Sequence, residues 1–239
     1  LKKIISKIKN RNFLTYGFNK KSNYQIFNTV YKKNYSVFDL RITTNTSQKK
    51  IIKKIKVNLI GSHNILNSVA AIALCSYIGV SLKVIKKSLK EFAGIQRRMT
   101  KVLKLNGNDF FDDYAHHPTE IKSVLDSLKK TNPKRKIISV FQPHRYSRIE
   151  LLKKEFSFSF RSSDKLLLCP VYSAGEKMSK NYDKEEFAKL ITKNSGVQVI
   201  LIDEQEELNK FFKKNLLKNE LIIGMGAGSI TKWMREINL

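Results

Sequence analysis

A short polar segment between Asp112 and Glu120 carries the side chains best suited to chemistry. It reads Asp112-Asp113-Tyr114-Ala115-His116-His117-Pro118-Thr119-Glu120 and holds two of the chain's four histidines. The preceding residues 109–111 are apolar enough for a buried strand, and Pro118 and Glu120 suit the first turn of a helix. In α/β sheets such a turn lies at the carboxyl ends of the strands, where ligands bind. The segment is therefore a candidate site, with a solvated helix cap and a zinc or iron site as alternatives.

A second polar segment follows the next expected strand along the chain. Residues 141–148 read Phe-Gln-Pro-His-Arg-Tyr-Ser-Arg, and Arg145 and Arg148 are three positions apart. Two guanidinium groups at this spacing could bind one anion together. Because parallel strands end at one edge of a sheet, the sequence predicts that both segments face one crevice. The side chains expected there are Asp113, Tyr114, His116, Arg145 and Arg148.

An earlier segment, residues 61–67, is expected to begin a helix that continues to Ile78. It reads Gly-Ser-His-Asn-Ile-Leu-Asn, and Ser62 is expected to be the N-cap. Asn64 and Asn67 are three positions apart and share one face of this helix. Two carboxamides so placed could pair with the edge of a purine ring, whereas helix capping by asparagine explains them equally well.

Two further segments could bind phosphate. Arg97 and Arg98 lie at a domain boundary expected near residues 95–99, and guanidinium groups grip phosphate oxygens in a bidentate fork. A solvated basic pair in a linker is the alternative. The glycine-rich residues 224–229 could cradle a phosphate at a helix N-terminus. Their spacing is not Gly-x-Gly-x-x-Gly, and tight backbone packing is an equal explanation.

The composition indicates a globular protein with an unusual charge. The 239 residues are 41% hydrophobic and carry a net charge of +26, and residues 1–60 hold 15 Lys or Arg against Asp39 alone. Such a charge attracts polyanions. Neither clustered aromatic residues nor a fold signature of nucleic-acid binding accompanies it, so we expect no nucleic-acid partner.

The cysteines and apolar runs indicate a cytoplasmic protein with no membrane partner. Cys75 and Cys169 lie in separate apolar runs, as expected of core thiols in a reducing compartment. The longest apolar run, residues 69–80, is too short to span a bilayer.

The order of the expected elements divides the chain into two α/β domains, residues 1–96 and 97–239. In the first, short β-favouring runs precede a helix at 62–78 and another at 81–92. The strands expected there are residues 13–18, 24–31, 35–42 and 55–60. In the second, strands alternate with amphipathic helices, which predicts a mostly parallel sheet covered on both faces. Its expected strands are residues 109–113, 136–141, 165–168, 197–202 and 220–225.

Four segments together resemble the Mur ligase family. They are residues 61–67, Arg97-Arg98, residues 112–120 and residues 141–148, and the resemblance covers residues 61–239 well. It implies that residues 1–96 are the carboxyl-terminal part of a central ATP-binding domain. It also implies that residues 97–239 are the Rossmann-like carboxyl-terminal domain of the family.

The resemblance implies an ATP-dependent amide ligase of peptidoglycan synthesis. ATP would phosphorylate the lactyl carboxylate of UDP-N-acetylmuramate, and the amine of L-alanine would attack the acyl phosphate. Residues 142–146 favour this activity over the recycling activity that joins a tripeptide to the same nucleotide sugar. Tyr114, His116, Arg145 and Arg148 would face the nucleotide sugar, and the last three would stabilise the negative charge that develops during catalysis.

The resemblance also implies how the nucleotide would be held. His63, Asn64 and Asn67 would contact adenine, Arg98 would bind a phosphate, and Asp113 would hold the ribose hydroxyls.

The sequence departs from the family in one large respect. It contains no Gly-x-x-Gly-Lys-Thr/Ser loop, whose lysine and hydroxyl serve phosphate and Mg²⁺. It also begins with Leu1, so we expect the carboxyl-terminal portion of such a ligase, with the Mg²⁺ ligands in a missing amino-terminal part. We expect this portion to be unable to catalyse ligation alone. The alternative is a stand-alone nucleotide- or nucleic-acid-binding module that has kept the fold and lost the chemistry.

Overall fold

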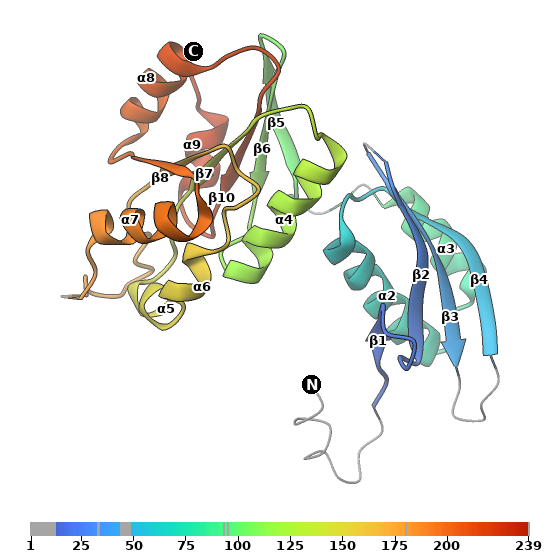
Figure 1. Cartoon of the computed structure of the whole chain (residues 1–239). Helices are drawn as coiled ribbons and strands as arrows, with labels where there is room; N and C mark the ends of the chain where they lie inside the picture. The colour runs from blue at the N-terminus through green and yellow to red at the C-terminus, as the bar shows by residue number, and fades with distance from the viewer. Residues whose placement is uncertain are drawn as a thin grey trace. The chain divides into compact units, whose positions relative to one another are not determined.

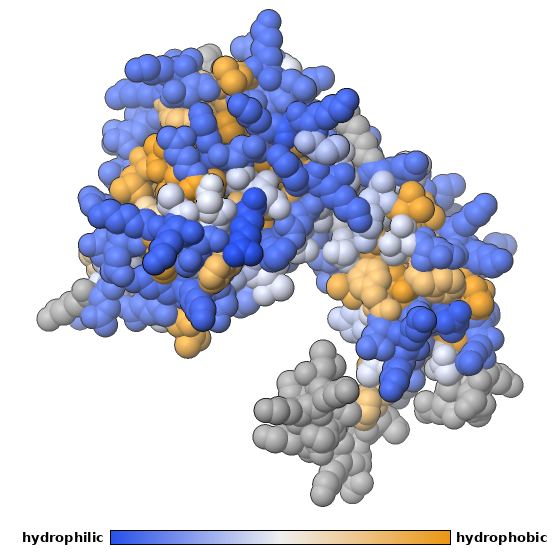
Figure 2. Space-filling model, viewed as in Figure 1, coloured by the Kyte–Doolittle hydropathy of each residue, from blue (hydrophilic) through white to orange (hydrophobic). Residues whose placement is uncertain are grey.

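The structure, a computed structural model, consists of two compact units (Figure 1). It describes residues 13–32, 34–43, 49–92, 94, 96–179 and 181–238. The first unit ends at residue 93, and the second begins at Gly94. Within the described ranges, every helix is too short or too polar to span a membrane. Most of the visible surface is hydrophilic (Figure 2), as expected of a chain with 46 Lys and Arg.

The first unit is a four-stranded sheet with two helices. Its strands lie in the order β1 (Tyr16–Gly17), β2 (Tyr24–Tyr31), β3 (Ser36–Thr43) and β4 (Lys49–Val57). β2, β3 and β4 are antiparallel, and β1 pairs with β2 in parallel. The helices are α2 (Ser62–Tyr77) and α3 (Leu82–Glu91). Alternate residues of β3, including Phe38 and Leu40, are buried against Ile65 and Val69 of α2 in one core, as the period of two in a strand requires.

Three sequence predictions for the first unit differ from the structure. Only Tyr16–Gly17 of the expected strand 13–18 pairs with a neighbour. The last strand spans Lys49–Val57 and not residues 55–60, because its exposed lysines look like a loop in the sequence but occupy the edge of the sheet, where lysine discourages further pairing. The N-cap of α2 is Gly61, with φ of 99°, and Ser62 already belongs to the helix.

The second unit is built on a six-stranded sheet of order β5-β6-β10-β7-β8-β9. All neighbours are parallel except β5 and β6. The strands are β5 (Thr100–Leu105), β6 (Asn108–Asp113), β7 (Ile137–Phe141), β8 (Lys165–Leu168), β9 (Gln198–Leu201) and β10 (Leu221–Met225). The helices are α4 (Pro118–Thr131), α5 (Tyr146–Leu151), α6 (Lys153–Ser157), α7 (Lys184–Ser195), α8 (Gln205–Asn215) and α9 (Ile230–Arg235). The predicted mostly parallel sheet is confirmed.

Two apolar cores cover the two faces of this sheet. Alternate residues of β7 point to opposite cores, with Ile137 and Phe141 in one and Ile138 and Val140 in the other. The first core includes side chains of α4, α6 and α7, and the second includes side chains of α8 and α9. Burial on both faces explains why the sequences of β7, β8 and β10 are mostly apolar.

The edge strand β5 was not among the strands expected from the sequence. It forms a hairpin with β6 through Asn106 and Gly107, which both have positive φ, 51° and 80°. Two successive residues with positive φ are the signature of the type I′ hairpin turn, and Asn-Gly is its preferred sequence. The Asn106-Gly107 dipeptide could therefore have predicted this hairpin from the sequence.

The topology places three strand ends side by side. β10 lies between β6 and β7, and Met225 is in register with both Asp113 and Phe141. The turns after β6 and β7 therefore flank the glycine turn after β10. α4 starts at Pro118, with His117 as N-cap and the Glu120 carboxylate accepting from the His117 N–H. This capping box fixes the direction in which the chain leaves β6.

Candidate functional site at the carboxyl ends of the strands

Asp113 lies at the end of β6 and is only 1% exposed. Its Oδ1 accepts from the Ala115 N–H and its Oδ2 from the Met99 N–H, each at 2.8 Å. Burial raises the pKa of Asp113 to about 6, although both hydrogen bonds act to lower it. Both carboxylate oxygens thus accept hydrogen bonds from the main chain, one from the turn after β6 and one from the segment just before β5. The Asp113 side chain therefore links these two segments.

Tyr114, His116, His144 and Arg148 form a continuous series of contacts. The His116 ring lies edge-on to the rings of Tyr114 and His144, with centroid distances of 5.1 and 5.7 Å. Arg148 Nη1 lies 3.0 Å from His144 Nδ1. The structure therefore brings the turns after β6 and β7 together, and three of the predicted residues, Tyr114, His116 and Arg148, belong to this contact series.

The hydrogen bonds of the two histidines define their tautomers. His116 Nδ1 lies 2.8 Å from the Tyr114 carbonyl oxygen, which can only accept, so Nδ1 carries the proton and Nε2 is the acceptor of the neutral ring. Arg148 can only donate, so His144 Nδ1 accepts. Burial, followed by the positive charge of Arg148, holds the pKa of His144 below its usual value.

Arg145 is exposed at the start of α5. Its main chain has φ of 69°, and its N–H donates to the Tyr172 carbonyl at 2.9 Å. Tyr172, which follows β8, also stacks on the His144 ring at 5.7 Å. His144 and Tyr172 were not among the site residues predicted from the sequence, although each follows a parallel strand at the edge where ligands are expected.

The glycine turn after β10 is closely packed. A Cβ on Gly226 would lie 2.8 Å from the Gln142 carbonyl oxygen, and one on Gly228 would lie 2.4 Å from Tyr172 Cγ. The buried Gln142 side chain accepts from the Ile230 N–H at 3.0 Å and donates to Ser229 Oγ at 3.0 Å. Of the two explanations offered by the sequence, backbone packing accounts for these glycines.

Arg97 and Arg98 enter the second unit beside Tyr114. The guanidinium carbons lie 4.5 Å (Arg97) and 6.0 Å (Arg98) from the centroid of the Tyr114 ring. Arg97 Nη2 also donates to the Gly226 carbonyl at 2.7 Å. The basic pair is therefore not a solvated linker. Together with the contact series Tyr114, His116, His144 and Arg148 it forms what we call the polar cluster.

The first unit holds the remaining candidates on α2. Asn64 is 5% exposed, and its Nδ2 donates to the Ile60 carbonyl at 2.8 Å. Asn67 is exposed and His63 is partly buried. The two carboxamides are thus unequal, because that of Asn64 stabilises the start of the helix while that of Asn67 faces solvent.

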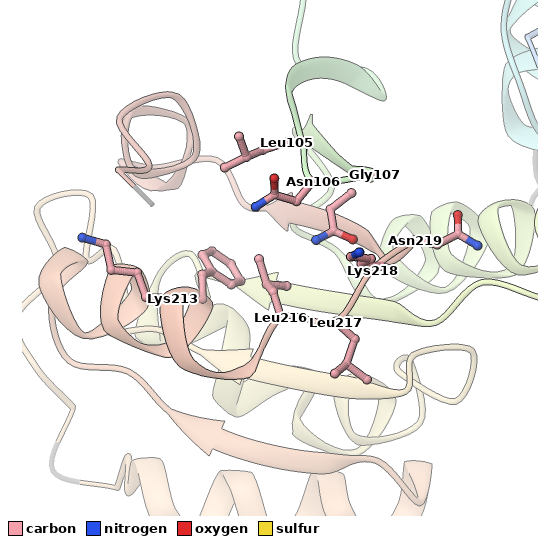
Figure 3. Close-up of a pocket in the computed structure, with 10 residues that line it drawn as sticks. Leu105, Asn106, Gly107, Lys213, Leu216, Leu217, Lys218 and Asn219 are labelled. Atoms are coloured by element: carbon pink, nitrogen blue, oxygen red, sulfur yellow. The ribbon is translucent and has the colours of Figure 1, made fainter.

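A hollow of about 730 Å³ lies where β6 and β10 begin, at the end of the second sheet opposite to the candidate residues (Figure 3). Its lining comes from the β5–β6 turn, the end of α8 and the loop before β10, and includes Leu105, Leu216, Lys213 and Lys218. None of the candidate residues lines it, so the hollow is separate from the polar cluster.

Comparisons with known proteins cover both units. A family model described as the Mur ligase, glutamate ligase domain matches residues 97–228, and the Mur ligase middle domain model matches residues 1–75. A UDP-N-acetylmuramate–L-alanine ligase from Pelagibacter ubique (strain HTCC1062) is 46% identical over 99% of this chain and 51% of its own length. The ligase of the same name from Bartonella bacilliformis is 35% identical over 96% of this chain and 48% of its own length.

A solved structure is similar across both units as well. The UDP-N-acetylmuramate–alanine ligase from Thermotoga maritima matches with a TM-score of 0.75 and 25% identity, covering 94% of this chain and 46% of that chain. The present chain spans about half the length of the relatives that it matches.

Proposed function

Because this chain belongs to the Mur ligase family, we propose that it serves in the ATP-dependent ligation of L-alanine to UDP-N-acetylmuramate in peptidoglycan synthesis. The observation that carries this proposal is the contact series Tyr114, His116, His144 and Arg148 at the carboxyl ends of β6 and β7. The 46% identity to a ligase of that name supports it. The chain spans only about half of that relative, so the complete activity is proposed for the two halves together.

The reaction needs positively charged groups that stabilise the developing negative charge, and an acceptor for a proton. ATP transfers its γ-phosphoryl group to the lactyl carboxylate and leaves as ADP. The amine of L-alanine then attacks the acyl phosphate, inorganic phosphate leaves, and the amine loses a proton. Arg145 and Arg148 supply positive charge where the anion develops. His116 Nε2 is the acceptor of its ring and is available for the proton, while Tyr114 faces the nucleotide sugar.

The same proposal assigns nucleotide contacts to both units. His63 and Asn67 would contact adenine together with Asn64, whose Nδ2 is already bonded to Ile60, so the exposed Asn67 carries most of this role. Arg98 would bind a phosphate. Asp113 would reach a ribose hydroxyl only through the lone pairs that its two main-chain hydrogen bonds leave.

Mg²⁺ is not assigned to this chain. Across the ranges that the structure describes, no group of three or more His, Cys, Asp or Glu side chains is placed to hold a metal ion. We therefore place no Mg²⁺ ligand among the described residues. A cytoplasmic location goes with the proposal, since Cys75 and Cys169 are both unpaired thiols, as is usual in a reducing compartment.

The experiment that tests the function compares the chain alone with a joined ligase. In the joined ligase, this chain replaces the matching part of the Pelagibacter ubique enzyme. We expect ATP-dependent formation of UDP-N-acetylmuramoyl-L-alanine by the joined ligase and none by the 239-residue chain, because phosphoryl transfer needs a complete phosphate and metal cradle. L-alanine-dependent ATP hydrolysis by the chain alone would refute its predicted inactivity. A folded joined ligase that accepts a tripeptide but not L-alanine would refute the proposed substrate.

The alternative function, a nucleotide- or nucleic-acid-binding module, rests on the net charge of +26. Polyanion binding through such a charge weakens steeply as salt rises and shows no sequence preference. Fluorescence anisotropy with single-stranded and duplex DNA at several salt concentrations separates the two functions. We expect only weak, salt-sensitive binding.

A further inference from the structure

Arg97 contacts Tyr114 at two points and the turn after β10 at a third. Its guanidinium lies over the Tyr114 ring at 4.5 Å, and its Nη2 donates to the Gly226 carbonyl at 2.7 Å. Its own carbonyl accepts from the Tyr114 N–H at 2.7 Å. One residue therefore fixes Tyr114 through both main chain and ring, and connects it to the turn after β10.

The buried side of the guanidinium faces Asp112. Arg97 Nε lies 4.0 Å from Asp112 Oδ2, and both atoms are buried without a hydrogen-bond partner. The other oxygen, Oδ1, accepts from Thr231 Oγ1 of α9 at 3.1 Å. The opposite charges attract at this distance, although burial raises the pKa of Asp112. Arg97 thus contacts Asp112 through Nε and the Gly226 carbonyl through Nη2, and both contacts are made within the protein.

The main chain of Arg97 adopts an uncommon conformation. Its φ is 61° and that of Met99 is 52°, a region that residues other than glycine rarely occupy. The hydrogen bonds from Tyr114 N–H to Arg97 and from Met99 N–H to Asp113 hold this conformation. A conformation that costs free energy persists only where the surroundings enforce it, which indicates that the placement of the Arg97 side chain matters.

We propose that Arg97 is a positioning residue, which holds Tyr114 and, through the Tyr114 ring, His116. Both the 5.1 Å ring contact and the hydrogen bond from His116 Nδ1 to the Tyr114 carbonyl pass the constraint on to His116. The inference rests on the proposed function in that Tyr114 and His116 face the nucleotide sugar. The two arginines of the basic pair then have different roles, because the Arg97 guanidinium contacts Tyr114 and Gly226 within the protein, whereas Arg98 is the residue proposed to bind phosphate.

The first test uses NMR on the 239-residue chain with labelled tyrosine and histidine rings. Arg97→Gly removes the guanidinium without strain, since glycine tolerates positive φ. Arg161→Gly is the matched control, because the Arg161 guanidinium lies over Phe158 at 4.9 Å and its Nε donates to the Asn194 carbonyl at 3.2 Å, away from the cluster. Tyr114→Phe and His116→Gln identify the two resonances.

We expect Arg97→Gly to shift the ring resonances of both Tyr114 and His116, and Arg161→Gly to leave them in place. Guanidinium ion at millimolar concentration should move them back in Arg97→Gly, whereas methylammonium should not, because only the planar fork reproduces the lost contacts. Unmoved Tyr114 and His116 resonances in a folded Arg97→Gly chain would overturn the proposal. The fluorescence of Trp233, the one tryptophan of the chain, reports that the unit is folded.

The second test measures kinetics in the joined ligase. Arg97→Gly should raise KM for UDP-N-acetylmuramate about tenfold with a smaller change in kcat, since a positioning contact contributes to binding in ground and transition states alike. Arg97→Lys should not recover the loss, because an ammonium group lacks the planar fork of the guanidinium, and Arg161→Gly should match the parent. Equal losses in Arg97→Gly and Arg161→Gly would reject positioning. If the parent joined ligase makes no product, the proposed function has failed, and the NMR result alone decides the role of Arg97.

Discussion

The imidazole rings of His116 and His144 lie 5.7 Å apart, at an interplanar angle of 61°. They belong to the turns after β6 and β7, which are separated in the sheet by β10. The turn after β10, the strand between them, contains Gly226, Ala227 and Gly228. The candidate site thus depends on three strands, although only two of them contribute its polar residues.

Replacing Arg148 with alanine should raise the pKa of His144. Burial is the first cause that holds this pKa below its usual value, and the Arg148 charge is the second. Removing that charge leaves burial in place, so the pKa should rise toward, and stay below, the usual value near 6.5. A ¹⁵N NMR titration of the imidazole measures it, with Arg161→Ala as the control. An unchanged His144 pKa in Arg148→Ala would show that the 3.0 Å contact does not exist in solution.

The same histidine makes stability depend on pH. Because the folded-state pKa of His144 is lowered, its contribution is present above the unfolded-state pKa and is lost as pH falls through the folded-state value. His144→Gln should therefore flatten the dependence of unfolding free energy on pH below about pH 7. Urea unfolding followed by Trp233 emission in the second unit checks this. A parent and a variant with parallel pH profiles would contradict it.

Asp113 should act in the opposite direction. Its folded-state pKa is raised to about 6 from 3.8, so its stabilising contribution is complete below the unfolded-state value and is lost as pH rises through about 6. A shift of this size corresponds to roughly 3 kcal/mol as an upper bound. The unfolding free energy of the parent, relative to that of Asp113→Asn, should therefore fall as pH rises from about 4 to about 7. Asp126→Asn, at an exposed site on α4, is the control.

The sequence predicted the second unit better than the details of its site. The parallel strands could be predicted chiefly because those buried on both faces, such as β7 and β10, are apolar along most of their length, and the edge where ligands are expected follows from the topology of such sheets. The contact between His116 and His144 could not, because the distance between their turns depends on the strand order, in which the last strand, β10, lies between β6 and β7. Strand order is a tertiary property that local patterns do not contain.

Individual roles were harder to assign, because they depend on hydrogen bonds to the main chain. Asp113 and Asn64 are chemically suited to ligands, yet each is buried and bonded to backbone groups. The position of Arg97 depends on a positive φ that no neighbouring glycine signals. Residue type and spacing therefore predicted a candidate site but could not separate side chains that support it from side chains that face solvent.

Asn64 and Asn67 should respond differently to replacement with alanine. Asn64→Ala removes the bond to Ile60 and should destabilise the start of α2 by about 1–2 kcal/mol. Asn67→Ala, at an exposed position, should leave stability unchanged and raise KM for ATP in the joined ligase. Hydrogen exchange of the α2 amides measures the first effect and steady-state kinetics the second. An unchanged KM in Asn67→Ala would remove Asn67 from the proposed adenine site.

Two glycines of the second unit separate the cost of steric overlap from that of backbone strain. A Cβ at Gly228 would lie 2.4 Å from Tyr172 Cγ and 2.6 Å from Gln142 Oε1, whereas Gly196 has φ of +69° and nothing within 4 Å of its Cβ. Gly228→Ala should cost about 2–4 kcal/mol, because the overlap involves Tyr172 Cγ and Cβ, which lie next to the main chain, and the buried Gln142 side chain, so both residues must shift. Gly196→Ala, at the C-cap of α7, should cost only about 1 kcal/mol. Because Tyr172 stacks on His144, Gly228→Ala should also shift the His144 ring resonances, and Gly196→Ala should not. Equal unfolding free energies for the two variants, with His144 unmoved in both, would show that the turn after β10 is loosely packed in solution.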